Sequence, residues 1–238
     1  MAKAMVEAAI KYRDHGFSVI PCGARDKFPD FEALRASRNL DRRGRPTWRA
    51  LQQRLPSDDE INSWFGSEDR NLGLVTGFGE LLILDFDAEG AFESWSHKFP
   101  ELAAGTSVQR SARGHHVLFR WSGVWTTRYL TAIGFQLPES RGRAAGAVKG
   151  RSDYVVAWPS IHPSGKEYHW LPGQAPWEAG ISRIASLQSI GIELMSPFPG
   201  SYFRFARNFL TEPRLGMKLL VRWFRNKDDK SAGRKSRF

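Results

Sequence analysis

The sequence predicts an α+β domain in which helices are interleaved with a mostly antiparallel sheet. Short β-forming runs recur between residues 72 and 158 and are separated by turn residues. Helical patterns precede and interrupt these runs, which suits an α+β arrangement. Hydrophobic residues make up 41% of the 238-residue chain, enough to bury a core.

The N-terminal part of the chain alternates helical signals with one short β-forming run. The first helix has an apolar face, and a glycine suited to a helix end follows it. The elements expected here are a helix over residues 2–15 that ends at Gly16, a strand over 17–21, a long functional or mobile loop over 22–50, and a short helix opened by the capping box Ser57-Asp-Asp-Glu60.

The middle of the chain is expected to form the sheet. The runs 72–76 and 81–87 are joined by Gly77-Phe-Gly79, a pattern typical of a hairpin. A helix through Trp95 follows them. Further strands are predicted over residues 105–110, 115–121, 131–136, 145–149 and 154–158.

The charge of the chain favours a polyanionic partner. The formal net charge is +10 and the pI is near 10, which suits nucleic acid, a nucleoside triphosphate or an anionic membrane surface. The alternative is a basic protein without such a partner. Cys22 is the one cysteine, which excludes an intrachain disulfide and a cysteine zinc site.

The sequence lacks targeting signals, a transmembrane segment and the P-loop motif. We find no signal peptide and no apolar window long enough for a transmembrane helix, so we expect a cytoplasmic protein with no membrane partner. The G-x-x-x-x-G-K-[ST] motif of P-loop ATPases is also absent.

The composition changes after about residue 178. Residues 179–210 are expected to be partly helical. The sequence from Arg214 to the end contains nine Lys or Arg and two Asp, which gives it a net charge of +7. Basic residues at roughly helical spacing indicate an amphipathic helix that contacts nucleic acid. A helix docked on the core with a solvated basic face is the alternative. The basic positions are Arg214, Lys218, Arg222 and Arg225.

Two acids end an apolar β run in Leu81-Leu-Ile-Leu-Asp85-Phe-Asp87. Residues i and i+2 of a strand point to the same face, roughly 7 Å apart, so the two carboxylates project side by side. Two unpaired like charges in a partly desolvated place are costly, and a divalent cation removes that cost. Mg²⁺ is commonly held by one or two carboxylates together with substrate phosphates. The alternative is an exposed strand end that starts a turn at Asp87.

Two histidines follow a small basic turn that contains Arg113 and Gly114. Consecutive strand residues face opposite sides, so only one of His115 and His116 can share the face of the carboxylates. That histidine could donate to a phosphate oxygen, and the glycine allows close backbone approach. A surface histidine pair on a half-exposed strand is the alternative.

A third segment joins a basic turn to a β run and a Pro/Ser/His loop. Its Lys149 and Arg151 could neutralise phosphates. An ordinary hairpin with a solvated turn is the alternative.

Together, these segments resemble the bifunctional primase–polymerase family of the archaeo-eukaryotic primase superfamily, from about residue 5 to 178. The resemblance rests on the order and spacing of several short motifs. These are Gly16-Phe-Ser-Val-Ile-Pro21, Lys27-Phe-Pro29, Ile61-Asn-Ser-Trp64, Asn71-Leu-Gly-Leu-Val-Thr-Gly77, Leu-Ile-Leu-Asp85-Phe-Asp87 and Tyr154-Val-Val-Ala-Trp-Pro-Ser-Ile-His-Pro-Ser-Gly165.

The resemblance implies a fold and an activity. The fold would be a primase–polymerase domain over residues 1–178, in which an RNA-recognition-like catalytic unit packs on a second small α/β unit. Residues 179–238 would form a basic, partly helical extension. The activity would be template-directed phosphodiester synthesis from nucleoside or deoxynucleoside triphosphates with Mg²⁺ or Mn²⁺. The implied partners are a single-stranded DNA template and a separate replicative helicase, in a plasmid, phage or integrated element.

The resemblance also assigns residues. Asp85 and Asp87 match the first pair of metal ligands. Gly114-His-His116 matches a small-x-His motif whose histidine contacts the incoming triphosphate, which selects His116 over His115. The residues that match the lining of the nucleotide pocket are Arg113, Gly114, His116, Lys149, Arg151, Ser160 and His162.

One position departs from the family pattern. The family's third metal carboxylate precedes Tyr154 by about seven residues, where this chain has Ala147. A natural loss, an engineered substitution or a different alignment would each explain this. Asp153 is the nearest acid, but its place indicates a turn residue. Because two metals about 3.5–4 Å apart need several bridging oxygens, we expect one metal to be weakly held and activity to be impaired.

Two other functions stay open at this point. One is a non-catalytic nucleic-acid or nucleotide-binding module with the same fold, which Ala147 favours. The other is a metal-dependent nuclease that uses the same two carboxylates.

Overall fold

The computed structural model describes residues 2–123, 128–130 and 146–192. They belong to one compact unit that runs to Ile192. The strand predicted over 131–136 lies outside the described residues. So do the basic positions Arg214, Lys218, Arg222 and Arg225.

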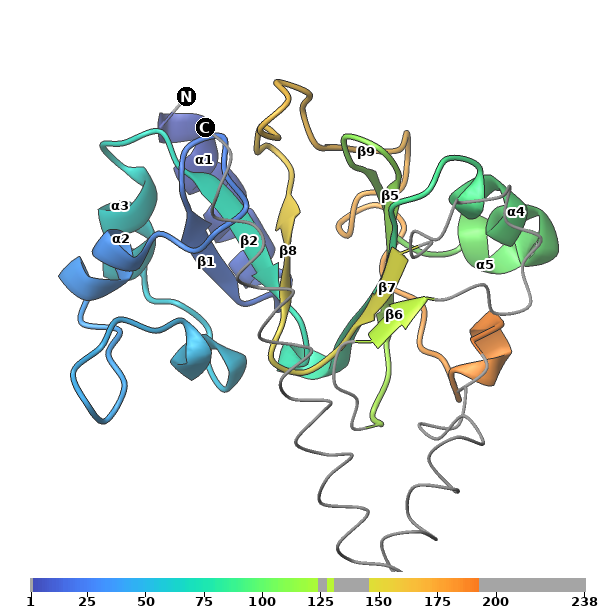
Figure 1. The fold of residues 1–238 in the computed structure, drawn as a ribbon, viewed down its shortest axis with the longest axis horizontal. Helices are drawn as coiled ribbons and strands as arrows, with labels where there is room; N and C mark the ends of the chain where they lie inside the picture. Colours follow the sequence, from blue (N-terminus) through green and yellow to red (C-terminus); the bar gives the residue numbers. More distant parts are fainter. Residues whose placement is uncertain (1, 124–127, 131–145, 193–238) are drawn as a thin grey trace, which may run out of the picture. The chain divides into compact units, whose positions relative to one another are not determined.

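The unit contains two antiparallel sheets, in agreement with the predicted α+β class (Figure 1). The order of one is β1-β2-β8, and that of the other is β6-β7-β3-β5-β4-β9. The strands are β1 Val19–Cys22, β2 Asn71–Val75, β3 Leu81–Phe86, β4 Val108–Arg110, β5 His115–Arg120, β6 Arg128–Leu130, β7 Gly146–Lys149, β8 Tyr154–Ala157 and β9 His169–Trp170.

The helices divide between the two sheets. Those beside the three-stranded sheet are α1 Ala2–Asp14, α2 Phe31–Ala36 and α3 Asp58–Phe65, and those on the six-stranded sheet are α4 Ala91–Lys98 and α5 Pro100–Ala104. Short 3₁₀ turns occur at Arg49–Gln52, Phe78–Glu80 and Gln188–Ile190. The predicted helix ends are confirmed. Ser57 and Glu60 form both bonds of the capping box, and Gly16 ends α1 with φ +76°.

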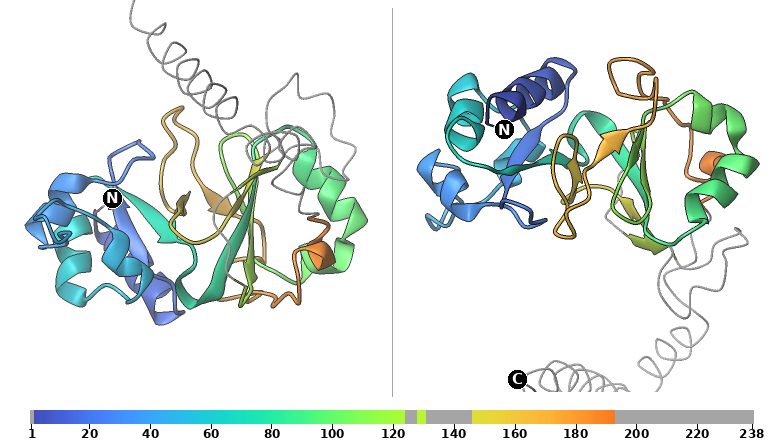
Figure 2. Two further views of the ribbon diagram at one scale, coloured as in Figure 1. Left: turned by 60° about the horizontal axis from the view of Figure 1, so that its bottom comes forward. Right: turned by 90° about the horizontal axis from the view of Figure 1, so that it is seen from above.

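The central strand β3 is apolar because both of its faces are covered. Leu82, Leu84 and Phe86 pack in the cluster that contains α4. Leu81 and Ile83 point the other way, into the cluster that contains the three-stranded sheet. Both views of Figure 2 show α4 and α5 on the side of the six-stranded sheet that lies away from β8. Asp85 therefore belongs to the face of β3 that is turned toward the three-stranded sheet.

The predicted hairpin between residues 72–76 and 81–87 is wrong. β2 and β3 lie in different sheets, and the turn Phe78–Glu80 carries the chain from one to the other. Gly77 and Gly79 have φ of +81° and +53°, which suits a hairpin turn equally well. The pairing is decided by burial, because β2 completes its own sheet between β1 and β8. The alternative of an ordinary hairpin at the basic turn with Lys149 and Arg151 is also wrong, because β7 and β8 belong to different sheets.

The region predicted as one long loop over 22–50 is partly ordered structure. It contains α2, whose N-cap Asp30 accepts hydrogen bonds from the backbone N–H groups of Glu32 and Ala33. Bridges at Cys22–Pro29 and Leu40–Pro46 close two small turns. The helix is only six residues long, so the charged, Pro- and Gly-rich flanks concealed its signal. The short elements α5 and β9 were missed as well.

Two glycines let the neighbours of β3 approach its end. A Cβ atom at Gly114 would lie 1.7 Å from the carbonyl oxygen of Phe86, and one at Gly146 would lie 1.8 Å from that of Asp85. Contacts this short to backbone cannot be relieved by a side-chain rotation. The end of β3 therefore depends on glycine on both sides.

Gly114→Ala should lower the free energy of unfolding by about 2–3 kcal/mol, because the backbone must move to admit the methyl group. Gly173→Ala is the control, since Gly173 has φ +71° and open space around it, and it should cost about 1 kcal/mol of backbone strain. Urea unfolding followed by tryptophan fluorescence measures both. Equal losses would contradict the close approach.

Candidate functional site

Side chains from both sheets line one cavity of about 250 Å³. The six-stranded sheet contributes acids, a histidine and a lysine, and β8 contributes the facing wall. The lining residues are Lys27, Asp85, Asp87, Ser111, Arg113, His116, Lys149, Asp153, Tyr154, Val155, Val156 and Tyr168.

Strand register places Asp85 at the centre of the polar part of this cavity. Its partner in β5 is His116, and its partner in β7 is Ala147. The Nε2 atom of His116 lies 3.3 Å from the Oδ1 atom of Asp85. Asp87 follows just after the strand and lines the same cavity. The two carboxylates predicted to act together are therefore neighbours in one cavity.

The two carboxylates have opposite electrostatic surroundings. Burial opposes ionisation of Asp85, but its contact with His116 and the positive charges of Lys149 and Lys27 outweigh burial, so the pKa of Asp85 is lowered. The pKa of Asp87 is raised by its own partial burial and by the negative charge of Asp85. A pair that repels in this way is suited to hold a cation.

A buried glutamine sets the orientation of the His116 ring. The Oε1 atom of Gln109 accepts a hydrogen bond from the Trp158 backbone N–H at 2.7 Å, and its Nε2 atom donates to the Val156 carbonyl at 3.1 Å. The same amide nitrogen donates to Nδ1 of His116 at 3.0 Å. Because Nδ1 accepts, the proton of the neutral ring is on Nε2, which faces Asp85.

His115 lies on the opposite face of β5, as the alternation of the strand predicts. Its ring packs against Phe92 of α4, with the centroids 4.1 Å apart. Burial there lowers its pKa to about 4. His115 therefore belongs to the core on the far side of the sheet.

The cavity has a basic rim. Lys149 pairs with Asp153 at 3.1 Å, and Arg113 lies 3.9 Å from Asp87. Lys27 extends from the turn that follows β1. Three cations next to a repelling acid pair suit a ligand that carries both phosphates and a metal ion.

Comparison with protein families supplies the identity of the domain. The family model described as bifunctional DNA primase/polymerase, N-terminal, matches residues 9–187. The chain belongs to this family. Membership implies nucleotidyl transfer of the primase and polymerase kind, together with binding of nucleotides and nucleic acid. A comparison with curated proteins finds no match. Among the helices in the described ranges, none is long and apolar enough to cross a membrane.

The primase–polymerase domain does not bring every predicted pocket residue to the cavity. Arg151 is exposed outside the lining and packs beside Gly77. Ser160 is fully buried, and its hydroxyl bonds the backbone N–H and carbonyl of Leu72 in β2. His162 stays outside the lining, where its Nδ1 atom bonds Ser164.

The acids of the primase–polymerase domain fit one cation better than two. Within residues 2–123, 128–130 and 146–192, no group of three or more His, Cys, Asp or Glu side chains is placed to hold a metal ion. Asp85 and Asp87 supply hard oxygen donors that suit one divalent ion shared with phosphate oxygens. Ala147 stands directly beside Asp85 and is 3% exposed. Asp153 is occupied by Lys149.

Sequence reasoning missed several residues of the primase–polymerase site. Lys27 belongs to the Lys27-Phe-Pro29 motif, but nothing local indicates that it reaches the cavity of the carboxylates. Tyr154 and Tyr168 resemble ordinary core aromatics. Gln109 had one usable signal, because the tight turn 111–114 places it across from His116 in a hairpin.

Gln109→Leu should lower the free energy of unfolding by about 2–3 kcal/mol, because it leaves the Trp158 N–H and the His116 ring without their partner. It should also remove the preference for the Nε2–H form of His116, which ¹⁵N NMR of the metal-free chain measures. Gln174→Leu removes two side-chain hydrogen bonds to backbone elsewhere in the domain, those to the Ala103 and Thr106 carbonyls, and should leave the His116 spectrum unchanged. An unchanged spectrum in Gln109→Leu would contradict the assigned role.

Asp87→Asn should stabilise the metal-free chain at neutral pH. A pKa raised above 3.8 means that the folded state holds the proton more tightly, so ionisation of Asp87 costs stability once the pH rises through that range. The gain should vanish as the pH falls toward 3.8. Chemical unfolding across this pH range measures it, with the exposed Glu89→Gln as a matched charge control. A gain that persists in acid would have another cause.

Proposed function

We propose that this chain extends or starts a nucleic-acid strand by transferring nucleotides from nucleoside or deoxynucleoside triphosphates on a single-stranded DNA template. The observation that supports this most is the cavity that joins Asp85 and Asp87 to three basic side chains, in a chain of the bifunctional primase–polymerase family. The reaction is the in-line attack of a 3′-hydroxyl on the α-phosphate, with pyrophosphate as leaving group.

The acids are proposed to hold Mg²⁺ or Mn²⁺, which would lower the charge on the phosphates during transfer. Burial on the face toward β8 limits the access of water to Asp85, whose side chain is 14% exposed, and leaves Asp87 more open at 44%. Lys149, Arg113 and Lys27 are proposed to bind the β- and γ-phosphates, because their charges flank the acids on the cavity rim.

His116 is proposed to donate from Nε2 to an oxygen of the triphosphate. Its Nδ1 atom is already satisfied by Gln109, so the ring presents a fixed donor to the cavity. In the chain alone that donor faces Asp85 at 3.3 Å. Gly114 is proposed to serve the site through the close approach of its turn to β3 rather than through a ligand contact.

The chain is further proposed to work in the cytoplasm with a separate replicative helicase, in the replication of a plasmid, phage or integrated element. The basic C-terminal positions, beginning at Arg214, are proposed to add contacts to the template. Family membership and the net charge of +10 support the nucleic-acid partner.

The test is primer synthesis and extension on single-stranded DNA with Mg²⁺ or Mn²⁺. Asp85→Ala and Asp87→Ala should each abolish synthesis while the chain stays folded. His116→Ala should weaken triphosphate binding more than template binding, and His115→Ala should change neither, since His115 lies on the far face of the sheet. Unchanged synthesis in both aspartate variants would refute the site. Cleavage of nucleic acid without any need for a triphosphate would indicate a nuclease.

A second function is favoured by one observation, the alanine beside Asp85. Ala147 and Asp85 are register partners in neighbouring antiparallel strands, so their side chains share a face. A carboxylate at position 147 would complete a three-acid site. Without it, the domain is proposed to be an impaired polymerase or a module that binds nucleotides and nucleic acid without efficient synthesis.

Ala147→Asp should raise synthesis in Mg²⁺ by at least about tenfold, equivalent to roughly 1.4 kcal/mol of transition-state stabilisation, because a third carboxylate can bind the second metal. The unaltered chain should be weak in Mg²⁺ and better in Mn²⁺, which binds more tightly. Steady-state extension rates with each metal measure this. Robust Mg²⁺-dependent synthesis by the unaltered chain that is lost in Asp153→Ala would assign the third ligand to Asp153 instead.

A further inference from the structure

One segment of the domain, residues 23–55, concentrates the exposed apolar side chains. All the large hydrophobic residues that stand exposed in the described part of the chain lie in it. They are Phe28 at 72% exposed, Phe31 at 46%, Leu40 at 42% and Leu55 at 37%. Elsewhere in residues 3–123 and 146–192, side chains of this kind are at least partly covered, so this grouping requires an explanation.

The same segment is strongly basic. It contains nine Lys or Arg against four Asp or Glu, an excess of five positive charges. Five of these arginines are exposed and have no acidic partner within 4 Å among the described residues: Arg25, Arg38, Arg42, Arg43 and Arg49. Exposed arginines and exposed aromatic rings in one segment suit single-stranded nucleic acid, because the cations bind phosphates and the rings stack on bases.

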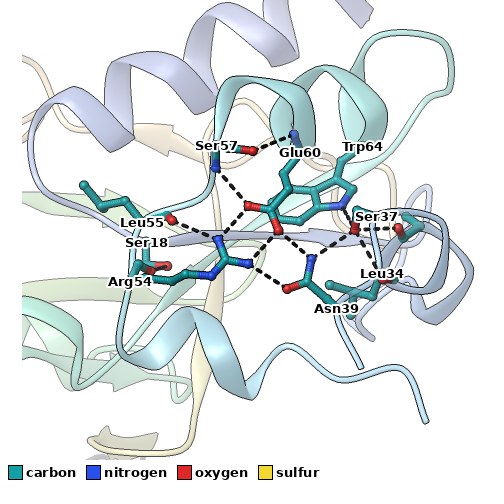
Figure 3. Close-up of polar contacts among 10 residues, drawn as sticks. Ser18, Leu34, Ser37, Asn39, Arg54, Leu55, Ser57, Glu60 and Trp64 are labelled. Atoms are coloured by element: carbon teal, nitrogen blue, oxygen red, sulfur yellow. Dashed lines mark hydrogen bonds and ion pairs between the residues drawn. The ribbon is translucent and has the colours of Figure 1, made fainter. Parts of the chain in front are cut away.

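Two of these arginines, Arg42 and Arg43, lie in a turn that has a polar network at its base. Figure 3 shows the Asn39 side chain between Ser37, Arg54 and Glu60. The turn above it closes through the Leu40–Pro46 bridge. Asp41 accepts hydrogen bonds from the backbone N–H groups of residues 43 and 45, so the tip is ordered and its charges point outward.

The segment is continuous with the cavity. The ring of Trp48 packs edge-on against Tyr154, with the centroids 5.4 Å apart. The Tyr154 hydroxyl donates to the Lys27 carbonyl oxygen at 2.9 Å. Both Tyr154 and Lys27 line the cavity. A nucleic-acid strand bound along residues 23–55 would therefore pass the rim of the cavity at Lys27, next to Phe28.

We propose that residues 23–55 bind single-stranded nucleic acid and lead it to the cavity, with Arg42 and Arg43 on phosphates and Phe28 stacked on a base. This inference rests on the proposed function for the identity of the strand as template. A single strand is favoured over a duplex because exposed rings can stack only on bases that are not already paired and stacked.

The experiment measures binding of a labelled single-stranded DNA oligonucleotide to the full chain as a function of salt, in EDTA and without triphosphate. Arg42→Ser/Arg43→Ser should reduce the slope of log K against log salt by about 1.4, since each phosphate contact contributes about 0.7. Lys98→Ser/Arg110→Ser removes the same charge from α4 and β4 and should leave the slope near that of the unaltered chain. Arg110 is a register partner of His115, so it belongs to the face away from the cavity.

Phe28→Leu keeps the apolar area but removes the ring, and it should weaken single-strand binding by about fivefold or more. Equal slopes in the two double variants, an unaffected Phe28→Leu chain, or tighter binding of duplex than of single strand would each overturn the inference. The outcomes also separate the two proposals. If the unaltered chain makes no product but the salt slopes change as predicted, only the proposed function is refuted. If the chain makes product but the two double variants have equal slopes, only the binding surface is refuted.

Discussion

The ionised carboxylate of Asp85, largely buried at the end of the central strand, is the constraint on which the rest of the site depends. A carboxylate in that place is stable only if nearby groups offset the loss of water. His116 from the neighbouring strand, with Lys149 and Lys27, provides that compensation, and the pKa of Asp85 falls despite its burial. Asp87 receives no comparable compensation, and its pKa rises. The two carboxylates thus lie close together, but the protein compensates only part of their negative charge. This suits the pair to bind a cation.

The same arrangement ties the two sheets together. Gln109 belongs to the six-stranded sheet, yet it bonds two backbone groups in and after β8 of the three-stranded sheet. It therefore orients the His116 ring and joins the walls of the cavity with one side chain. Gly114 and Gly146 are needed for the backbone at the same place. The turn before β5 and the start of β7 can approach the end of β3 only because these two positions have no Cβ atom. Position of the reactive groups and stability of the sheet junction depend on the same few residues.

Sequence reasoning succeeded where a signal is local. The capping box at Ser57, the glycine after α1 and the apolar run that leads to Asp85 are each complete within a few residues, and each has the structure that its pattern predicts. The alternation of β5 likewise separates His116 from His115. Prediction from the sequence failed where two structures share one local signal. The glycine turn at 77–79 suits a hairpin and a crossover between sheets equally well.

The sequence by itself determined the α+β class, the acid pair at the end of an apolar run, the opposite faces of His115 and His116, and the family. These depend on periodicity within a segment or on the order of motifs along the chain. Only the tertiary structure decided which strands pair, that Ser160 is buried with its hydroxyl bonded to β2, and that Lys27 and Gln109 reach the site. It also placed Ala147 directly beside Asp85. The physical reason is that these facts depend on burial and contact between segments far apart in sequence, and such contacts leave no periodicity within either segment.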